Sequence, residues 1–554
     1  MTGLYIILGS ILIVGFIVAL FAVMVIKVPP DVPDTDMMSR TVTSSGSVVH
    51  LGKNWLNRNK HGLYEMYVAG APFERGVVNG RLTEKLIYTQ EKIFISEIKA
   101  IVKNSFYLGF LKYVVAWINR KLKKYIGNEY DQEIYGVSLS ASKDFRLIGP
   151  NYMRVLNYHA AHDIGHMLQD MNLVGCTSFV ARGGRTENEQ IIHARNFDFY
   201  VGDEFCKEKI ITFYAPDKGH RFVMITWGAL IGTVSGMNVK GLAITVNAAK
   251  SKLMAKTATP VTILIREMLQ YASTIDEVIE IAKKRKIFVS ESFLVSSGRE
   301  NRALIIEKTP YQTELFDPGT EQIICTNHFQ SGALKNDPIN LKHIEGSASM
   351  YRYKRTAELL ASHPKLSVKA AVEILRDRKG LGDVSIGNGN EKTVNQLLAH
   401  HSVVFNPVEL KMWISAGEFG LGEFICYDLH EVFSRAEDFQ DGDTIIKEDL
   451  AIVHDNFLDN GGFEDFERFK ELKKKISDTP GNFDVSQEEI DGFTGLNPDY
   501  YLSYSVAGNF FYNKKDYVKA AGYYRTALRK EIPTVQEREE IKKKMKFCEN
   551  RTPN

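Results

Sequence analysis

The sequence is poor in cysteine and in net charge, and both shortages exclude whole classes of protein. Five cysteines among 554 residues are too few for a disulfide framework, and their odd number leaves at least one thiol unpaired within the chain. The 69 basic and 67 acidic side chains leave a formal charge of +2, which argues against a broad basic surface for nucleic acid. Because 44% of the residues are hydrophobic and 11% aromatic, we expect a globular chain of two to four domains.

The familiar metal and nucleotide motifs are also absent. The sequence has no H-E-x-x-H pair and no glycine-rich phosphate loop between a strand and a helix. His159, His162 and His166 are spaced to share one face of a helix, but no second His or Cys pair completes a metal site. We therefore predict neither a metal nor a cofactor.

Only one stretch is long and apolar enough to cross a bilayer. Residues 2–26 contain no charged side chain, and about 20 apolar residues suffice to span the hydrocarbon core. A cleavable signal peptide fits less well, because no basic residue precedes the run and no A-x-A site follows it. We predict a membrane anchor over 1–28, with residues 4–26 in the bilayer, and a proline-containing stalk or linker over 29–61.

The C-terminal part has a different composition. Residues 437–467 hold eleven acidic side chains and one lysine without EF-hand spacing, so we expect an acidic helical segment over 431–495. Over 496–554 the small and aromatic positions of one tetratricopeptide-like (TPR-like) helical hairpin are occupied by Gly508, Phe511, Ala520, Tyr524 and Ala527. One repeat cannot bury its own apolar face. Two helices packed on the main body are therefore as well supported as a site for a protein partner.

The middle of the chain changes from helical to strand-like patterning near Gly175. Residues 62–175 are mostly helical by periodicity, whereas 176–430 contain short β-branched runs separated by turns, which indicates a layered α+β arrangement. Cys176 begins the first such run, and Arg195 and Asp198 follow in the next. A lone cysteine is more often a buried hydrophobe, but a nearby arginine would lower the pKa of its thiol. Residues three apart point to opposite faces of a regular strand, so a turn or bulge must bring Arg195 and Asp198 together.

These motifs resemble the N-terminal-nucleophile (Ntn) hydrolases that cleave linear amides. GCTS followed by HARNFDF is similar to the nucleophile region of the acyl-CoA:6-aminopenicillanate acyltransferase (peptidase C45), choloylglycine hydrolase and acid ceramidase group. Further matches follow in order across residues 62–430: G-x4-RG-x3-G from Gly70, GMN-x2-GLA from Gly236, TNHF from Thr326, S-x2-R from Ser349, and HSVVFNP-x3-KMWISAG from His401. The resemblance implies a four-layer αββα sandwich, with 62–175 as the pro-segment and 176–430 as the catalytic fragment.

By resemblance, the precursor is cut between Gly175 and Cys176. Glycine would allow the unusual backbone conformation that brings the sulfur to the preceding carbonyl. Cleavage gives Cys176 a free α-amine, whose reference pKa near 8 leaves enough of it neutral to act as the base for its own thiol.

The resemblance also assigns roles to five other residues. Arg195 would stabilise the thiolate or the bound acyl group, and Asp198 would hold the α-amine. Asn247 and Asn327 are candidates to donate amide N–H groups to the oxyanion, and Arg352 would complete the polar cluster. From sequence alone, Asp198 could instead be a turn residue and Asn247 a helix cap.

Two functional hypotheses of different classes follow. The first is a membrane-tethered, self-cleaving amidase that acts on an N-acyl amide, possibly a lipid-like one, through a Cys176 thioester, with acyl transfer to an amine as its variant. The second is a non-catalytic scaffold that binds a protein partner through the C-terminal hairpin. We predict that the catalytic body is extracytoplasmic. The orientation stays open, because Lys27, the only cation near the anchor, favours a cytoplasmic position for the residues that follow it.

Overall fold

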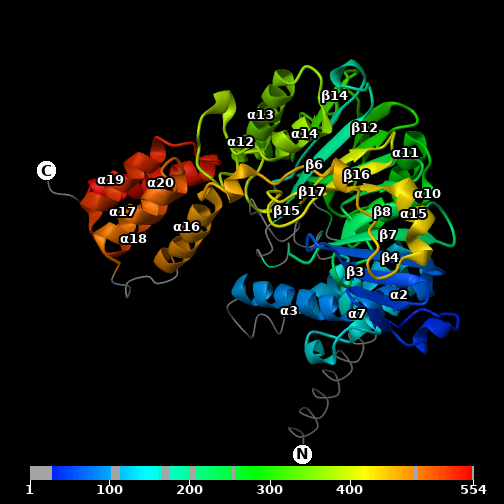
Figure 1. Cartoon of the computed structure of the whole chain (residues 1–554). Coiled ribbons are helices and arrows are strands. Elements are labelled where there is room, and N and C mark those ends of the chain that lie inside the picture. Colours follow the sequence, from blue (N-terminus) through cyan, green and yellow to red (C-terminus); the bar gives the residue numbers. More distant parts are fainter. Residues whose placement is uncertain are drawn as a thin grey trace, which may run out of the picture.

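The computed structural model describes residues 28–101, 113–160, 163, 175–199, 204, 207–252, 254, 256–477 and 485–551. The described part divides into a two-sheet body and a helical unit at its C-terminal end, which projects to one side of the body (Figure 1). The predicted membrane anchor over 4–26 lies outside the described residues. Among the helices of the described part, none is both long and apolar enough to cross a bilayer.

The larger sheet has eleven strands in the order β1-β2-β3-β4-β7-β8-β9-β10-β11-β12-β13. Its neighbouring strands are antiparallel except β4 and β7, which run parallel in register from Tyr64↔Ile210 to Gly70↔Pro216. The bounds are β1 Thr43–Ser45, β2 Val48–Leu51, β3 Asn54–Arg58, β4 Tyr64–Gly70, β7 Ile210–Pro216, β8 Phe222–Thr226, β9 Ser235–Asn238, β10 Leu242–Ala249, β11 Ser290–Ser297, β12 Arg302–Lys308 and β13 Thr313–Phe316.

The smaller sheet has six antiparallel strands in the order β14-β5-β6-β15-β16-β17. The hairpin β5–β6, which follows Cys176, lies inside this sheet rather than at its edge. The bounds are β5 Thr177–Ala181, β6 Ile192–Asp198, β14 Gln322–Cys325, β15 Ala399–Asn406, β16 Lys411–Ser415 and β17 Phe424–Asp428.

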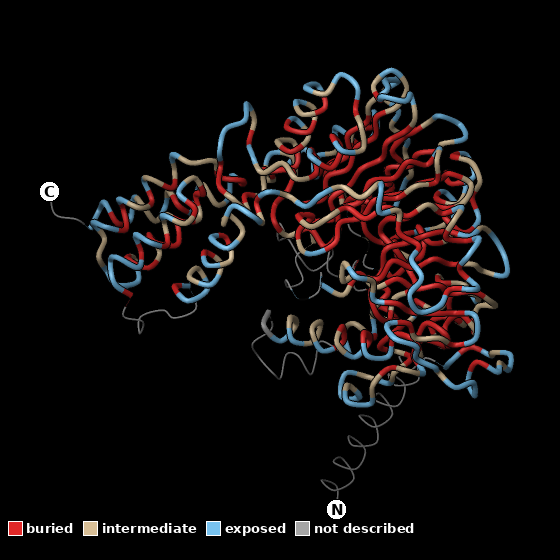
Figure 2. Tube along the Cα trace, viewed as in Figure 1, coloured by how far each residue is buried: buried red, intermediate tan, exposed pale blue. Residues whose placement is uncertain are grey.

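Strand alternation explains how the two sheets pack against each other. Tyr67 and Phe213 of the larger sheet share an apolar cluster with Val403 and Phe405 of the smaller sheet. Val404, between the last two, points to the opposite face and joins a cluster with helices. The buried chain is concentrated in these strands (Figure 2).

Helices cover both outer faces, so the body has four layers in the order αββα. One group packs on the larger sheet: α2 Pro72–Leu82, α3 Glu84–Ile101, α5 Leu122–Ile126, α6 Asn128–Ser138, α7 Asn151–Tyr158, α10 Val261–Tyr271 and α11 Ile275–Lys284. On the smaller sheet lie α13 Ser349–Ser362 and α14 Val368–Leu375, with α12 Pro338–Gly346 before them. The layered α+β arrangement predicted from the sequence is therefore present.

The apolar core of the C-terminal unit is built mainly from α16 to α20 and also includes Leu397, Phe419, Leu421 and Phe457, which precede these helices. In this core the Tyr524 ring packs so closely on Gly508 that a Cβ at Gly508 would lie 2.6 Å from the ring. The bounds are α15 Leu429–Arg435, which ends the body, then α16 Gly462–Ser477, α17 Gln487–Leu496, α18 Tyr501–Asn513, α19 Tyr517–Leu528 and α20 Val535–Glu549. The assignment of α18 and α19 to a TPR-like repeat and the protein partner there remain predictions.

Two segments differ from the boundaries expected from sequence. Within the predicted linker over 29–61, residues 43–58 form β1, β2 and β3 of the larger sheet. Trp55 is fully buried there and donates from Nε1 to the Ala436 carbonyl at 2.7 Å, a long-range contact that local proline content does not reveal. In the predicted acidic helical segment, residues 436–461 form short 3-10 turns and two isolated bridges to β17, and the long helix begins at Gly462.

Candidate active site

The site is assembled around the start of the β5–β6 hairpin. Cys176 precedes β5 and is 1% exposed. The register Thr177↔Asn196 and Ser178↔Arg195 places the end of β6 beside it. The Cys176 Sγ donates to the Asp198 carbonyl oxygen at 3.7 Å, and the Gly175 N–H donates to that same oxygen at 3.1 Å. The hairpin therefore brings the candidate nucleophile to the HARNFD motif.

Arg195 is the cation next to the thiol. Its Nη2 lies 3.6 Å from Cys176 Sγ and also donates to the Val246 carbonyl, while Nη1 donates to the Val234 carbonyl at 2.6 Å and to Ser235 Oγ at 2.5 Å. These carbonyl and hydroxyl partners fix the direction of the fully buried guanidinium. Arg195 is thus placed to stabilise a thiolate at Cys176.

The thiol itself is not activated in the intact chain. Burial raises the pKa of the Cys176 thiol, and the positive charge of Arg195 offsets only part of that effect. Arg195 therefore acts to lower the thiol pKa, as expected, but the net shift in the uncleaved chain is upward because loss of hydration outweighs the attraction of one cation. A separate base is needed to remove the thiol proton.

Asp198 lies at the end of β6, where the neighbouring strand is irregular. The pairing of β6 with β15 shifts between Ala399 and His401, so the extra residue lies in β15 and not between Arg195 and Asp198, where the spacing had predicted a turn or bulge. Burial raises the pKa of the Asp198 carboxyl to about 7, although Arg352 and Arg195 both act to lower it. Its Oδ1 has no hydrogen-bond partner among the described residues.

The Gly175 carbonyl, at the predicted cleavage point, is bound by two side chains. Arg352 Nη1 donates to it at 2.6 Å and also contacts the Cys176 carbonyl at 2.7 Å. Gln396 Nε2 donates to the same Gly175 oxygen at 2.6 Å and to Asp198 Oδ2 at 3.3 Å. Gln396 is a site residue that the sequence reasoning missed, since a single glutamine before a strand carries no motif.

The reason for glycine at position 175 differs from the one expected. Gly175 does not have a positive φ, so its place in the chain does not depend on a left-handed backbone. A Cβ there would lie 2.2 Å from Gln396 Nε2, which is far inside contact distance. A side chain at position 175 would therefore displace the Gln396 amide from its place beside the backbone.

The two candidate oxyanion donors lie in the same cluster but donate elsewhere. Asn247 Nδ2 donates to the Cys325 carbonyl at 2.8 Å, and Asn327 Nδ2 donates to the Ala248 carbonyl at 3.0 Å. Asn327 Oδ1 accepts from Arg352 Nη2 at 2.8 Å, which ties it to the Gly175 carbonyl site. Each amide nitrogen has a second N–H, so both residues remain candidates for an oxyanion formed during amide turnover.

The histidines set aside as metal ligands have structural partners where they are described. His159 Nε2 accepts from the Ile231 N–H at 3.0 Å, its Nδ1 contacts the Val155 carbonyl at 2.8 Å, and burial lowers its pKa to about 4. His162 and His166 lie outside the described residues. Over the described ranges, no group of three or more His, Cys, Asp or Glu side chains is arranged to hold a metal.

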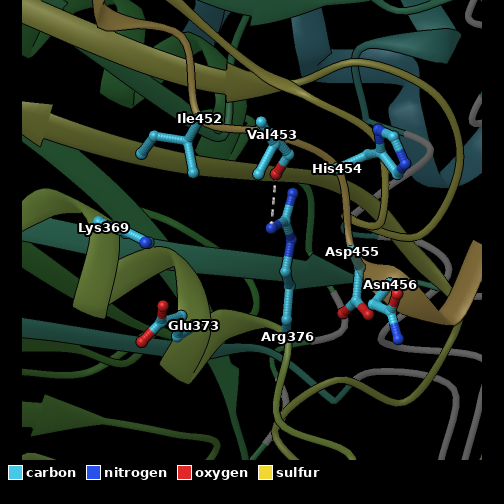
Figure 3. Close-up of a pocket in the computed structure, with 8 residues that line it drawn as sticks. All are labelled: Lys369, Glu373, Arg376, Ile452, Val453, His454, Asp455 and Asn456. Atoms are coloured by element: carbon cyan, nitrogen blue, oxygen red, sulfur yellow. Dashed lines mark hydrogen bonds between the residues drawn. The ribbon is translucent and has the colours of Figure 1, made fainter.

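A surface hollow of 390 Å³ lies apart from these residues, between α14 and residues 452–456 (Figure 3). Its central cation, Arg376, donates to the Val453 carbonyl at 2.9 Å and to the Gly422 carbonyl at 2.7 Å. None of the predicted site residues lines it. The guanidinium therefore ties two loops together, and the hollow is not the site of the chemistry predicted at Cys176.

Comparison with known families agrees with the geometry around Cys176. Residues 185–420 match the family described as acyl-coenzyme A:6-aminopenicillanic acid acyl-transferase. The match begins after Cys176 but includes Arg195, Asp198, Asn247 and Arg352. The match covers less than half of the chain, and this similarity confirms the resemblance to the Ntn hydrolases.

Two relatives show how far the similarity extends. An uncharacterized protein of Archaeoglobus fulgidus is 24% identical over 264 residues, which are 45% of this chain and 44% of that protein. The N-acylethanolamine-hydrolyzing acid amidase of Caenorhabditis elegans is 23% identical over 204 residues, which are 35% of this chain and 55% of that protein. The chain thus spans about half the length of the curated relatives it matches.

Two solved structures are also similar to parts of this chain. An N-acylethanolamine-hydrolyzing acid amidase ortholog from C. elegans is 19% identical with a TM-score of 0.31, over 42% of this chain and 93% of its own. A mutant of conjugated bile acid hydrolase from Clostridium perfringens is 14% identical with a TM-score of 0.32, over 46% of this chain and 92% of its own.

Proposed function

We propose that the protein is a self-cleaving cysteine Ntn hydrolase that hydrolyses a linear N-acyl amide through a thioester on Cys176. The observation that carries the proposal is the placement of the Cys176 thiol 3.6 Å from Arg195 Nη2, directly after a Gly175 carbonyl that Arg352 binds at 2.6 Å. Nucleophile, cation and bound carbonyl are what acyl transfer to sulfur requires.

Self-cleavage comes first in this scheme. Cys176 Sγ adds to the Gly175 carbonyl carbon, the C–N bond to Cys176 breaks, and its nitrogen takes up the thiol proton. Water then hydrolyses the resulting thioester, which releases Gly175 as a carboxylate and restores the thiol. Cys176 is 1% exposed in the intact chain, so we infer that amide substrates react only after this cut.

Amide turnover then uses the new α-amine of Cys176. The amine removes the thiol proton that burial otherwise retains, and Sγ adds to the acyl carbon of the substrate. Asp198 holds the amine, Arg195 stabilises the sulfur anion, and the amides of Asn247 and Asn327 donate to the oxyanion. The leaving amine departs protonated, and water hydrolyses the thioester to a free acid.

The nature of the acceptor separates hydrolysis from acyl transfer. The matching family is named for an acyltransferase, whereas two of the relatives are named for hydrolysis of N-acylethanolamine and conjugated bile acid. N-acylethanolamine is by its name an acyl group joined to a small polar amine. This supports N-acyl amides with a lipid-like acyl part as the substrate class, with water as the acceptor. Transfer to an amine is the second candidate.

Cleavage is tested on the full chain, synthesised in the presence of detergent. Wild type should convert from 62.7 kDa to two fragments, and N-terminal sequencing of the larger should begin at Cys176. Cys176→Ala should stay intact, whereas Cys426→Ala, which removes another buried thiol, should still be cut. Wild type that stays whole would overturn the proposal and favour the scaffold hypothesis. A panel of N-acyl amides, with and without added amine, then separates hydrolysis from transfer.

A further inference from the structure

The side-chain amide of Gln396 is bound to the carbonyl at the predicted cleavage point. Gln396 is 3% exposed, and its Nε2 lies 2.6 Å from the Gly175 oxygen. The oxygen therefore accepts from two side-chain donors, Gln396 and Arg352, at equal distances. No other residue in the described part of the chain donates a hydrogen bond from its side chain to this oxygen.

Two such donors suit the charge that develops in self-cleavage. When a sulfur adds to a carbonyl, the oxygen becomes an anion, and donors already in place stabilise it without reorganisation. The amides expected from sequence to serve an oxyanion are directed elsewhere in the intact chain, Asn247 to the Cys325 carbonyl and Asn327 to the Ala248 carbonyl. Gln396 and Arg352 thus occupy the position of the oxyanion donors for the cut at Gly175.

The position of Gln396 is fixed by the strap, residues 386–398, which precedes β15 and contacts both the body and the C-terminal helical unit. On the body side, Asn395 Nδ2 donates to the Phe419 carbonyl at 2.9 Å and the Asn395 N–H to the Asp377 carbonyl at 2.8 Å. On the other side, Asn390 Nδ2 donates to the Glu531 carbonyl at 3.0 Å. The amide is therefore held before the reaction rather than recruited by it.

We propose that Gln396 is a catalytic residue of self-cleavage, which stabilises the oxyanion formed on Gly175 together with Arg352. The inference rests on the proposed function. In this step Sγ of Cys176 bonds to the Gly175 carbon, the oxygen gains the electron pair of its π bond, and the Gln396 N–H donates to it. Collapse of the oxyanion expels the Cys176 nitrogen, which takes up the thiol proton, and water then hydrolyses the thioester.

The test measures the rate of cleavage of newly synthesised full chain in detergent by denaturing gel. Gln396→Leu keeps the size of the side chain but removes the donor, and should slow cleavage about 100-fold, the usual effect of losing one oxyanion donor. The matched control is Gln190→Leu, at the opposite end of the β5–β6 hairpin, where Gln190 contacts Asn406; it should cleave at the wild-type rate. Hydroxylamine, which attacks thioesters, should not restore fast cleavage in Gln396→Leu, because the defect precedes the thioester.

A second variant separates chemistry from folding. Gln396→Glu keeps the shape of the side chain and donates a hydrogen bond only when the carboxyl is protonated. The ratio of its cleavage rate to the wild-type rate should therefore rise as pH falls. A purely structural role would leave this ratio independent of pH. Cleavage of Gln396→Leu within threefold of wild type, or a Gln396→Glu ratio independent of pH, would overturn the inference while leaving the proposed function intact. Absence of cleavage in wild type would overturn both.

Discussion

At Asp198, burial and neighbouring charges act on the pKa in opposite directions. Two arginines, Arg195 and Arg352, act to lower its pKa, yet removal of water raises it to about 7. The carboxyl of the intact chain therefore holds its proton to a much higher pH than an exposed aspartate. Once cleavage creates an ammonium group at Cys176, the ion pair predicted with it would favour the carboxylate.

The raised pKa makes a prediction about stability. The folded chain keeps a proton on Asp198 that the unfolded chain loses near pH 3.8, so this contribution to stability falls as pH rises from about 4 to 7. We therefore measure thermal midpoints in the uncleaved Cys176→Ala background, with and without Asp198→Asn. The change in midpoint that Asp198→Asn causes should be more positive at pH 7 than at pH 4. The exposed Asp276→Asn is the control. Equal pH dependence with and without Asp198→Asn would contradict the prediction.

At the scale of elements, the strap connects the C-terminal unit with the active site. The Asn388 N–H donates to Asn497 Oδ1 at 3.1 Å, and Asn497 Nδ2 donates back to the Asn388 carbonyl at 2.8 Å. Tyr500 adds a hydroxyl donor to the Gly389 carbonyl at 2.9 Å. Since Gln396 follows on the same strap, the helical unit has a structural route to the site that needs no protein partner.

Weakening that contact should slow self-cleavage. Asn497→Ala removes both hydrogen bonds to Asn388, and we expect cleavage to slow several-fold, because Gln396 is then held less firmly. Val518→Ala, on the exposed face of α19, is the matched control and should cleave normally. The rates are compared by denaturing gel as for Gln396. Normal cleavage in Asn497→Ala would show that the body side alone positions the strap.

At the scale of the whole molecule, the cut at Gly175 divides elements that are packed together. β1 to β4 belong to the N-terminal fragment, yet β4 pairs with β7 of the other fragment inside the larger sheet. Glu133 of α6 also contacts Arg266 of α10 at 3.0 Å, with both side chains fully buried. The proposed anchor over 1–28 would then hold the catalytic fragment at the membrane through packing alone.

This predicts that the cleaved fragments stay together. They should co-elute in gel filtration at high salt and separate only in denaturant. Glu133→Ala leaves the buried charge of Arg266 unpaired, which should cost about 3–5 kcal/mol of folding stability. The fragments of this variant should therefore separate at a lower urea concentration than those of the wild type. The control is Glu280→Ala, which breaks an exposed ion pair with Lys283 worth about 1 kcal/mol or less. Its fragments should separate at the wild-type urea concentration. Release of the larger fragment under native conditions would contradict the prediction.

The site was predictable from sequence to the extent that its parts are close in the chain or lie in a motif. Cys176, Arg195 and Asp198 are joined by one hairpin, so pairing of adjacent strands brings them together. Asn327 and Arg352 could be placed beside them only through the family motifs. Gln396 was out of reach, since it lies 221 residues from Gly175 and belongs to no motif.

The sequence by itself determined the alternation that builds two sheets, the hairpin that carries the nucleophile, and the apolar run at the start of the chain. Each depends on neighbours within a few residues, where side-chain period and hydrophobicity decide the outcome. Only the tertiary structure decided that residues 43–58 are strands, that the thiol pKa is raised, and that Gln396 binds the Gly175 carbonyl. Strand pairing, desolvation and hydrogen bonding at these places depend on residues far away in the chain, so no local pattern encodes them.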